Sequence, residues 1–221
     1  MARMPRLVVP GYPHHVTQRG NRRQRTFFSE DDYHYYIALM SESAREAETE
    51  IWAYCLMPNH VHLVMVPSTE DGLRATLGEA HRQYTRHINL RQGWRGHLWQ
   101  ERFHSFLMEE DYLLATVRYV ECNPVAARLC RHPEEWPWSS ARAHLQGIDD
   151  SLVIVRPMLD RIPDWNDYLS KANESDRTES IRQHNRTGRP LGGAEFIQTL
   201  EQKTGKTLAP KRSGPKPSTT S

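Results

Sequence analysis

Two histidines separated by one residue, His60 and His62, have the types and the spacing to bind a metal ion. They lie in the run PNHVHLVMVP, whose β-branched and apolar residues predict a strand. Residues i and i+2 of a strand face the same side, with Cα atoms roughly 6.6 Å apart, so the two imidazoles can converge on one ion. Imidazole with oxygen ligands suits Mg²⁺ or Mn²⁺ with positions left open for a substrate. The alternative is two polar residues on the solvated face of a strand.

A second candidate pair is Tyr119 and Asn123, in the run RYVECNPVAARL. Residues four apart on a helix share a face. A tyrosine hydroxyl is a possible nucleophile for phosphoryl transfer, and an asparagine supplies a carbonyl oxygen that can complete a metal site. The alternative is a tyrosine that packs its ring, with Asn123 capping a helix before Pro124.

The elements that must position these residues follow from hydrophobic periodicity and from turn and capping signals. Strands are predicted at 12–20, 51–57, 60–66 and 98–108, and helices at 30–48, 72–90 and 109–122. The order β-α-β-β-α-β is that of an α+β, ferredoxin-like split β-α-β sheet. We expect helices on one face of this sheet, additional C-terminal helices, and a functional site on the other face.

The later part of the chain divides by composition. A short helix is expected to continue through Cys130, and a Trp/Pro/Ser-rich elbow leads to a helix at 139–146. We predict a main domain over 1–148, a helical and loop extension over 149–184, and a basic, partly disordered tail over 185–221. Within that tail, 185–193 is a turn-rich linker, 194–202 is one short helix, and 211–221 is disordered.

Charge is distributed unevenly along the 221 residues, although the net charge is only +2. Residues 1–25 carry six arginines and no acid, and residues 181–221 carry eight basic and two acidic residues. Basic ends favour binding to a phosphate backbone, and the alternative is solvated tails. With 38% hydrophobic residues, no long apolar run, three cysteines and no CxxC pair, the sequence predicts a soluble protein of a reducing cytoplasm, with no membrane partner and no disulfide framework.

Several segments together resemble a known group of enzymes. The strand PNHVHLV is similar to the metal motif of the HUH endonuclease superfamily, and RYVECNPVAARL followed by PEEWPWSSA resembles the single-tyrosine HUH transposases of small bacterial insertion sequences. The segments YPHHVTQRGNRRQ and HLWQERFHSFLM are also similar to this family. The resemblance is greatest to the REP-associated tyrosine transposases, and it covers residues 6–146.

This resemblance implies a role for each candidate residue. His60 and His62 would be metal ligands, Asn123 the third, polar ligand, and Tyr119 the nucleophile. Relatives with two nucleophilic tyrosines space them YxxxY. Positions 115 and 123 are alanine and asparagine here, so a single-tyrosine enzyme is expected.

The activity implied by the resemblance is metal-dependent nicking and strand transfer of single-stranded DNA through a 5′-phosphotyrosine intermediate, on REP-type palindromic hairpins. The ion would be Mg²⁺ or Mn²⁺, and no nucleotide cofactor is expected because no P-loop pattern is present. A monomer is favoured over a homodimer. Two alternatives remain open: a non-catalytic or domesticated DNA-binding protein on the same fold, and a metal-dependent hydrolase unrelated to DNA.

Basic residues near the first strand are the candidates for DNA binding. Arg19, Arg22, Arg23 and Arg25 flank that strand and its turn, where they could contact phosphates or the hairpin, or form a solvated loop. The neighbouring His14 and His15 are interpreted as structural or DNA-facing residues rather than ligands.

Two serines and two tryptophans in the elbow are interpreted as structural. Trp136 and Trp138 are expected to pack the last helix against the sheet. Ser139 and Ser140 are expected to cap that helix, because no histidine and aspartate pattern accompanies them.

Overall fold

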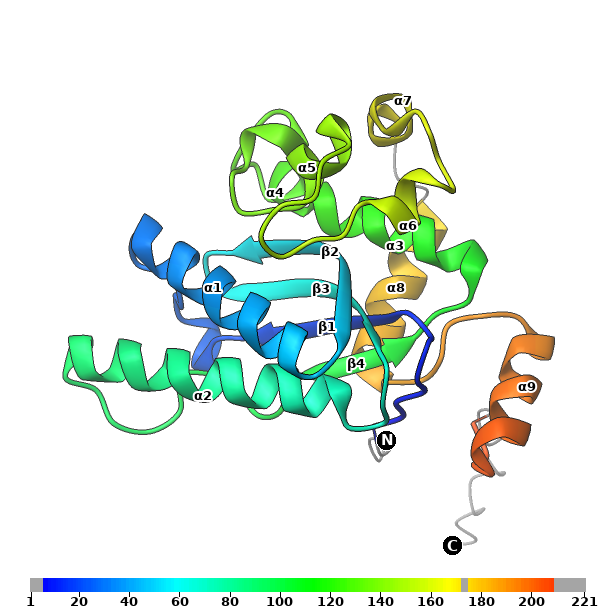
Figure 1. The fold of residues 1–221 in the computed structure, drawn as a ribbon, viewed down its shortest axis with the longest axis horizontal. Coiled ribbons are helices and arrows are strands. Elements are labelled where there is room, and N and C mark those ends of the chain that lie inside the picture. Colours follow the sequence, from blue (N-terminus) through cyan, green and yellow to red (C-terminus); the bar gives the residue numbers. More distant parts are fainter. Residues whose placement is uncertain (1–5, 172–174, 209–221) are drawn as a thin grey trace, which may run out of the picture.

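The computed structural model describes residues 6–171 and 175–208, and its centre is a four-stranded antiparallel sheet. The strands are β1 (His14–Arg19), β2 (Thr49–Met57), β3 (His60–Pro67) and β4 (His104–Leu107), in the order β2-β3-β1-β4 (Figure 1). The structure confirms the expected α+β, split β-α-β arrangement. It also confirms the hairpin, because β2 and β3 are joined by only Pro58 and Asn59.

Helices α1 (Glu30–Glu46) and α2 (Gly72–Gln92) cover one face of the sheet. Helix α1 begins at the predicted residue, after Ser29 and with three acids, Glu30, Asp31 and Asp32, in its first turn. The buried carboxylate of Asp32 accepts hydrogen bonds from the Phe28 and Ser29 N–H groups, and Arg91 of α2 donates to it at 2.7 Å. One large apolar core fills this layer, and β3 supplies it with Val61, Leu63 and Met65.

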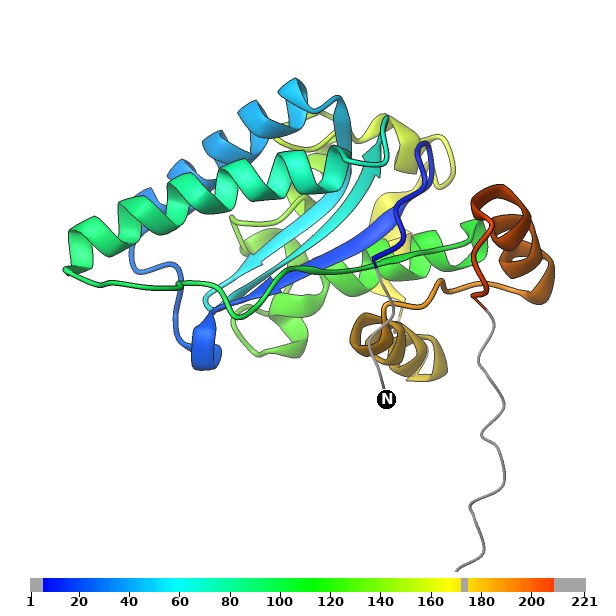
Figure 2. The same ribbon diagram turned by 90° about the horizontal axis from the view of Figure 1, so that it is seen from below.

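Helices α3 (Glu110–Glu121) and α8 (Ser175–Thr187) lie on the opposite face, so the sheet is sandwiched between two helical layers (Figure 2). A second apolar core lies between α3 and the sheet, and Val64, Phe106 and Val117 are among its members. The additional helices expected after β4 therefore lie on the face of the sheet that was expected to carry the functional site.

The other helices are short and surround these two layers. They are the 3₁₀ helices Asn21–Arg23 and Pro133–Glu135, then α4 (Asn123–Ala126), α5 (Ala141–Gln146), α6 (Arg156–Leu159), α7 (Trp165–Ser170) and α9 (Ala194–Thr204). Helix α9 confirms the helix expected after the linker. It packs Leu200 against Leu7, Val9 and Leu107.

The structure differs from the sequence prediction in two segments. The strand expected at 98–108 is regular only over 104–107, because Glu101 adopts a left-handed conformation (φ 46°) and interrupts the pairing. Before it, a single bridge joins Trp99 to Gly20. The linker expected from residue 185 begins later, since α8 continues through Thr187. The expected disorder at 211–221 lies outside the described residues.

The elbow packs as predicted. Trp138 stacks on Tyr33 with ring centroids 4.6 Å apart, and Trp136 donates its indole N–H to the Leu56 carbonyl.

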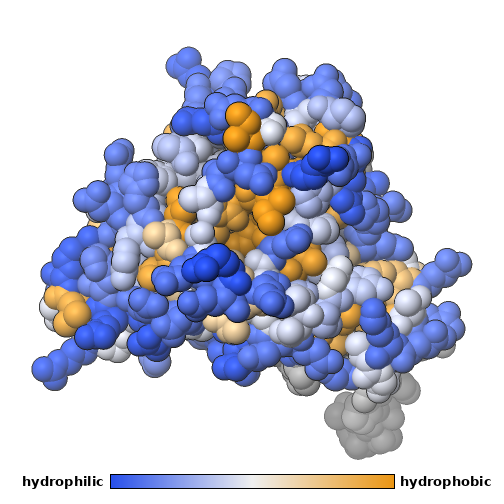
Figure 3. Space-filling view, viewed as in Figure 1, coloured by the Kyte–Doolittle hydropathy of each residue, from blue (hydrophilic) through white to orange (hydrophobic). Residues whose placement is uncertain are grey.

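The face viewed in Figure 1 is mostly hydrophilic, with an apolar area in a hollow near its centre (Figure 3). Within the described ranges, none of the helices is long and apolar enough to cross a membrane.

Candidate active site

A cleft of about 830 Å³ opens on the face of the sheet that carries α3 and α8. It brings together side chains from β1, β3, the 100–104 segment, α3, α4 and α8. These include Thr17, Arg19, Arg23, His60, His62, Gln100, His104, Tyr119, Asn123, Thr178, Arg182, Asn185 and Arg186. The four residues singled out as ligands and nucleophile therefore share one cleft, within one chain.

Strand alternation places the two histidines. His60 and His62 face the cleft, while Val61 and Leu63 are fully buried in the core beneath α1 and α2. The ring centroids of His60 and His62 are 4.9 Å apart. His62 is buried and His60 is half-buried.

Burial keeps both imidazoles neutral. Loss of hydration, with a smaller contribution from the nearby Arg19 guanidinium, lowers the pKa of His60 to about 4. Burial also holds the pKa of His62 well below its usual range, with a smaller contribution from His60. A neutral imidazole keeps a lone pair on one ring nitrogen, which is the form that binds metal ions.

Contacts to the ring nitrogens indicate where those lone pairs lie. His60 Nδ1 is 2.6 Å from the amide oxygen of Asn59, which can only accept, so the proton of His60 is on Nδ1 and the lone pair is on Nε2. His62 Nδ1 lies 3.0 Å from His15 Nε2, and its Nε2 lies 3.5 Å from Asn123 Nδ2.

Tyr119 occupies the last turn of α3 and approaches His62 from the helix side of the cleft. Its ring is perpendicular to that of His62 at 87°, with centroids 5.7 Å apart. Asn123 is the first residue of α4. Pro124 has no N–H to donate to the preceding turn, so α3 ends at Glu121, but Cys122 keeps a helical conformation and the register survives the break.

The donor set of the cleft fits a divalent cation only with the amide included. In the part of the chain that the structure describes, no three His, Cys, Asp or Glu side chains are grouped so that they could hold a metal ion. His60, His62 and Asn123 offer two neutral nitrogens and, after a half-turn of the amide, one carbonyl oxygen. This mixed set suits Mg²⁺ or Mn²⁺ with open positions better than a closed structural site.

The predicted arginines separate into two pairs. Arg19 and Arg23 line the cleft, and Arg19 lies opposite His60 in the β1–β3 register. Arg22 and Arg25 are exposed and do not line it. The turn that carries Arg22 and Arg23 is held in left-handed conformations, with φ 54° and 60°.

Sequence reasoning missed the contribution of α8 to the cleft. Thr178, Arg182, Asn185 and Arg186 all line it, and the Thr17 hydroxyl of β1 donates to Asn185 Oδ1 at 2.8 Å. The available signal was the pair of arginines four residues apart, which places both on one helix face.

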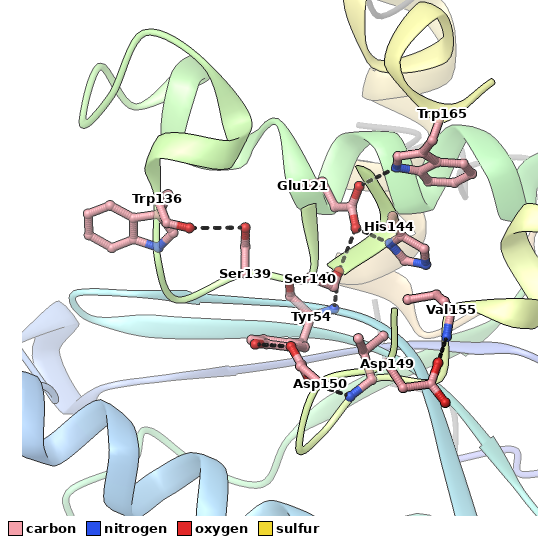
Figure 4. Close-up of polar contacts among 11 residues, drawn as sticks. Tyr54, Glu121, Trp136, Ser139, Ser140, His144, Asp149, Asp150, Val155 and Trp165 are labelled. Carbon is pink, nitrogen blue, oxygen red and sulfur yellow. Dashed lines mark hydrogen bonds and ion pairs between the residues drawn. The ribbon is translucent and has the colours of Figure 1, made fainter. Parts of the chain in front are cut away.

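A buried cluster fixes the end of α3 that carries Tyr119 (Figure 4). One carboxylate oxygen of Glu121 accepts from the Ser140 hydroxyl at 2.5 Å and from His144 Nδ1 at 2.6 Å. The other accepts from the indole N–H of Trp165 at 2.9 Å. Three donors, which come from α5, α7 and the elbow, therefore fix the C-terminal end of α3.

This cluster contains serine, histidine and glutamate, yet it lacks the geometry of a nucleophilic triad. Ser140 and His144 both bond to the same oxygen of Glu121, and no hydrogen bond joins their side chains to each other. All three are buried. Ser140 is therefore structural and stands at the N-cap position of α5, but the expected capping by its side chain is wrong, because its hydroxyl donates to Glu121 and makes no cap hydrogen bond.

The family of the chain follows from its match to known proteins. The family described as "Transposase IS200 like" matches residues 9–123, just over half of the chain. The chain belongs to the IS200-like transposase family. The matched segment begins before β1 and ends at Asn123, so it contains His60, His62 and Tyr119.

Two relatives of this IS200-like chain carry a more specific name. A REP-associated tyrosine transposase of Haemophilus influenzae is 31% identical over 102 residues, which cover 41% of this chain and 58% of the relative. The chain thus spans a little over half the length of that curated relative. A solved structure titled as a REP-associated tyrosine transposase bound to a REP hairpin aligns with a TM-score of 0.56 at 23% identity, over 68% of this chain and 90% of that one. This likeness supports the fold.

A transposase from Deinococcus radiodurans superposes less well. Its TM-score is 0.38 at 20% identity, over 54% of this chain and 96% of that one.

Proposed function

We propose that this protein is a tyrosine transposase that nicks single-stranded DNA and rejoins strands through a 5′-phosphotyrosine intermediate. The observation that carries the proposal is the position of Tyr119, whose ring stands 5.7 Å from that of the neutral His62 in a cleft shared with His60 and Asn123. Membership of the IS200-like family supports it.

In this proposal the four residues have two tasks. His60, His62 and Asn123 hold a divalent ion, Mg²⁺ or Mn²⁺, which when bound polarises the scissile phosphate and stabilises the charge of the transition state. Tyr119 Oη attacks phosphorus and loses its proton as the new P–O bond forms. The bond to the 3′ oxygen breaks, leaving a 3′-OH that can later reverse the step. Because the phosphotyrosine conserves the bond energy, no nucleotide cofactor is required.

DNA binding is assigned to the charged walls of the cleft. Arg19 and Arg23 from β1 and the turn after it, and Arg182 and Arg186 from α8, line the same cleft as Tyr119. Phosphates attract guanidinium groups irrespective of base sequence, so this arrangement guides a strand into the cleft. We propose hairpin DNA of the REP type as the substrate, in keeping with the names of the two relatives.

A single chain supplies every residue of this proposed site. Helix α3 packs on the sheet that carries His60 and His62, and Glu121 ties it to α5 and α7 of the same chain. We therefore propose that a monomer is competent for cleavage.

The test is a denaturing gel of the protein with end-labelled single-stranded hairpins taken from around its own gene, with Mn²⁺ or with EDTA. We expect a metal-dependent band of DNA linked to protein. Tyr119→Phe should still bind the hairpin in a native gel but form no adduct. Tyr112→Phe is the matched control, because Tyr112 lies on the same helix under Arg177 and outside the cleft.

Two outcomes would overturn the proposal. An adduct that persists in Tyr119→Phe would assign the nucleophile elsewhere. Tight hairpin binding without cleavage in any divalent metal would leave the protein as a DNA-binding member of the fold.

A further inference from the structure

His15 is a buried histidine of β1 that the proposed function does not use. It is fully buried on the same face of the sheet as His62, and the two are diagonal neighbours, since Thr17 of β1 lies opposite His62. The rings are parallel within 4°, and His15 Nε2 lies 3.0 Å from His62 Nδ1. Parallel rings with nitrogens at this distance are joined edge to edge by a hydrogen bond.

We propose that His15 is a positioning residue that accepts the Nδ1 proton of His62 and so holds the Nε2 lone pair of His62 toward Asn123 and the cleft. This inference deepens the proposed function and rests on it. The buried pair has two possible arrangements. In one, His62 donates from Nδ1 and keeps a lone pair on Nε2. In the other, His15 donates, and His62 carries its proton on Nε2, which prevents coordination there.

Contacts on the far side of His62 favour the first arrangement. With the amide oriented as in this structure, Asn123 Nδ2 lies 3.5 Å from His62 Nε2, a long contact in which the amide donates and Nε2 offers its lone pair. A lone pair on Nε2 places the proton of the neutral ring on Nδ1, where it can be donated to His15.

The other nitrogen of His15 has an energetic consequence. His15 Nδ1 is buried and has no hydrogen-bond partner. An apolar ring of similar shape would remove this unpaired group, but it would also leave His62 Nδ1 without its partner. A residue present only for packing would not need a hydrogen-bonding nitrogen at Nε2. A residue that orients a metal ligand would need that nitrogen, because ligating histidines usually donate the proton on their other ring nitrogen to a fixed acceptor.

The first test reads the tautomer directly and needs neither metal nor DNA. In metal-free full-length protein with ¹⁵N-labelled histidine at pH 7.5, long-range ¹H–¹⁵N spectra should show His62 protonated on Nδ1 and unprotonated on Nε2. His15→Phe should shift His62 partly to the Nε2–H form. If wild-type His62 carries its proton on Nε2, the proposal is wrong.

The second test measures Mn²⁺ affinity without DNA, from the free-ion signal in electron paramagnetic resonance. His15→Phe should weaken binding about 10–100-fold, the usual effect of losing such a partner. His15→Gln, whose amide oxygen can reach the position of Nε2, should recover most of it. His81→Phe is the matched control, because His81 is paired with Tyr36 on the α1–α2 side of the sheet.

The results separate the two proposals. Unchanged Mn²⁺ affinity in His15→Phe contradicts the role of His15 and leaves the proposed function intact. Absence of Mn²⁺ binding in the wild type, with His62 protonated on Nδ1, contradicts the metal site while the His15–His62 hydrogen bond stands.

Discussion

Tyr119 and Asn123 lie one helical turn apart on opposite sides of a helix break. Tyr119 belongs to the last turn of α3 and Asn123 begins α4, yet both line the same cleft because Cys122 between them keeps helical angles (φ −83°, ψ 0°). Because the helix is interrupted, Asn123 is not part of a continuous α3. The i, i+4 spacing from Tyr119 nevertheless keeps its amide beside His62. The cap residue at this break is Cys122, so the alternative interpretation of Asn123 as a helix cap is wrong.

This placement predicts a specific effect of shortening the side chain. Asn123→Ala should weaken Mn²⁺ binding at least about tenfold and slow cleavage, because a ligand oxygen is removed, whereas Asn123→Gln should retain part of both. Equilibrium Mn²⁺ titration and single-turnover cleavage measure the two effects. Equal Mn²⁺ affinity in Asn123→Ala and wild type would remove Asn123 from the ligand set.

The two pairs of arginines should differ in DNA binding. Changing Arg19 and Arg23 together to glutamine should weaken hairpin binding and reduce the salt dependence of binding, by about 0.7 in the logarithmic slope for each phosphate that is no longer neutralised. The same double change at Arg22 and Arg25, which lie outside the cleft, is the control. Binding isotherms at several salt concentrations measure both slopes, and equally weakened binding in the two double variants would argue against the cleft as the DNA path.

Helix α8 offers a change that should strengthen binding. The Glu179 carboxylate lines the cleft and lies 3.5 Å from Arg186 and 4.0 Å from Arg182. Removing its charge frees both arginines to bind phosphate and removes the repulsion between the carboxylate and phosphate. Glu179→Gln should therefore bind hairpin DNA more tightly at low salt. Arg182→Gln should have the opposite effect. Fluorescence anisotropy measures both, and unchanged binding in the two variants would indicate that DNA does not contact α8.

The Glu121 cluster should dominate the stability of the region behind Tyr119. Glu121→Ala leaves the buried His144 Nδ1–H and Trp165 Nε1–H without an acceptor, while the Ser140 hydroxyl keeps the Tyr54 carbonyl, and we expect the free energy of unfolding to fall by about 3 kcal/mol. Glu110 is the control on the same helix: its ion pair with Arg161 is largely exposed, so Glu110→Ala should cost under about 1 kcal/mol. Urea denaturation compares them, and a small destabilisation in Glu121→Ala would contradict the assigned role.

His14 should make stability depend on pH. Its Nδ1–H donates to the Tyr12 carbonyl and its Nε2 accepts from the Val9 N–H, so the folded state holds it neutral, and burial lowers its pKa to about 4. Because the folded pKa lies below the unfolded value of 6.5, the unfolded chain takes up the proton first. The stabilisation is therefore complete above pH 6.5 and declines as the pH falls toward 4.

The measurement is urea denaturation at pH 7.5 and pH 5 in wild type and in His14→Gln. The free energy of unfolding of the wild type should fall by about 2 kcal/mol more than that of the variant between these two values, since one unit of pKa corresponds to about 1.4 kcal/mol. Parallel decreases in both proteins would show that His14 is not the responsible group.

Much of the fold followed from local patterns. The acids in the first turn of α1, the apolar stripe of α2 and the alternation of β3 each predicted an element that the structure contains. The strand before α3 was predicted too long, because nothing local in LWQERF reveals the left-handed backbone at Glu101. The shared cleft of His60, His62, Tyr119 and Asn123 agrees with the expected grouping, while their chemical roles stay predictions.

The features that sequence reasoning missed all depend on long-range contacts. His15 lies next to His62 only because of the β1–β3 register, 47 residues apart in the chain. The partners of Glu121 lie 19 to 44 residues away, on elements whose docking no local pattern specifies. Helix α8 has a single large apolar residue, Ile181, and is otherwise polar, so its sequence does not indicate which surface it covers.

Strand β3 serves two opposite surfaces at once, and this limits how it can vary. Its even-numbered residues 60 and 62 face the cleft, and Val61, Leu63 and Met65 fill the core under α1 and α2. Inserting or deleting one residue within β3 would exchange the two sets, burying imidazoles among apolar side chains and turning valine and leucine into the cleft. The alternation along β3 therefore determines both which side chains fill the core and which side chains line the cleft. Length changes in this family should be confined to the connections between strands, where no alternation has to be preserved.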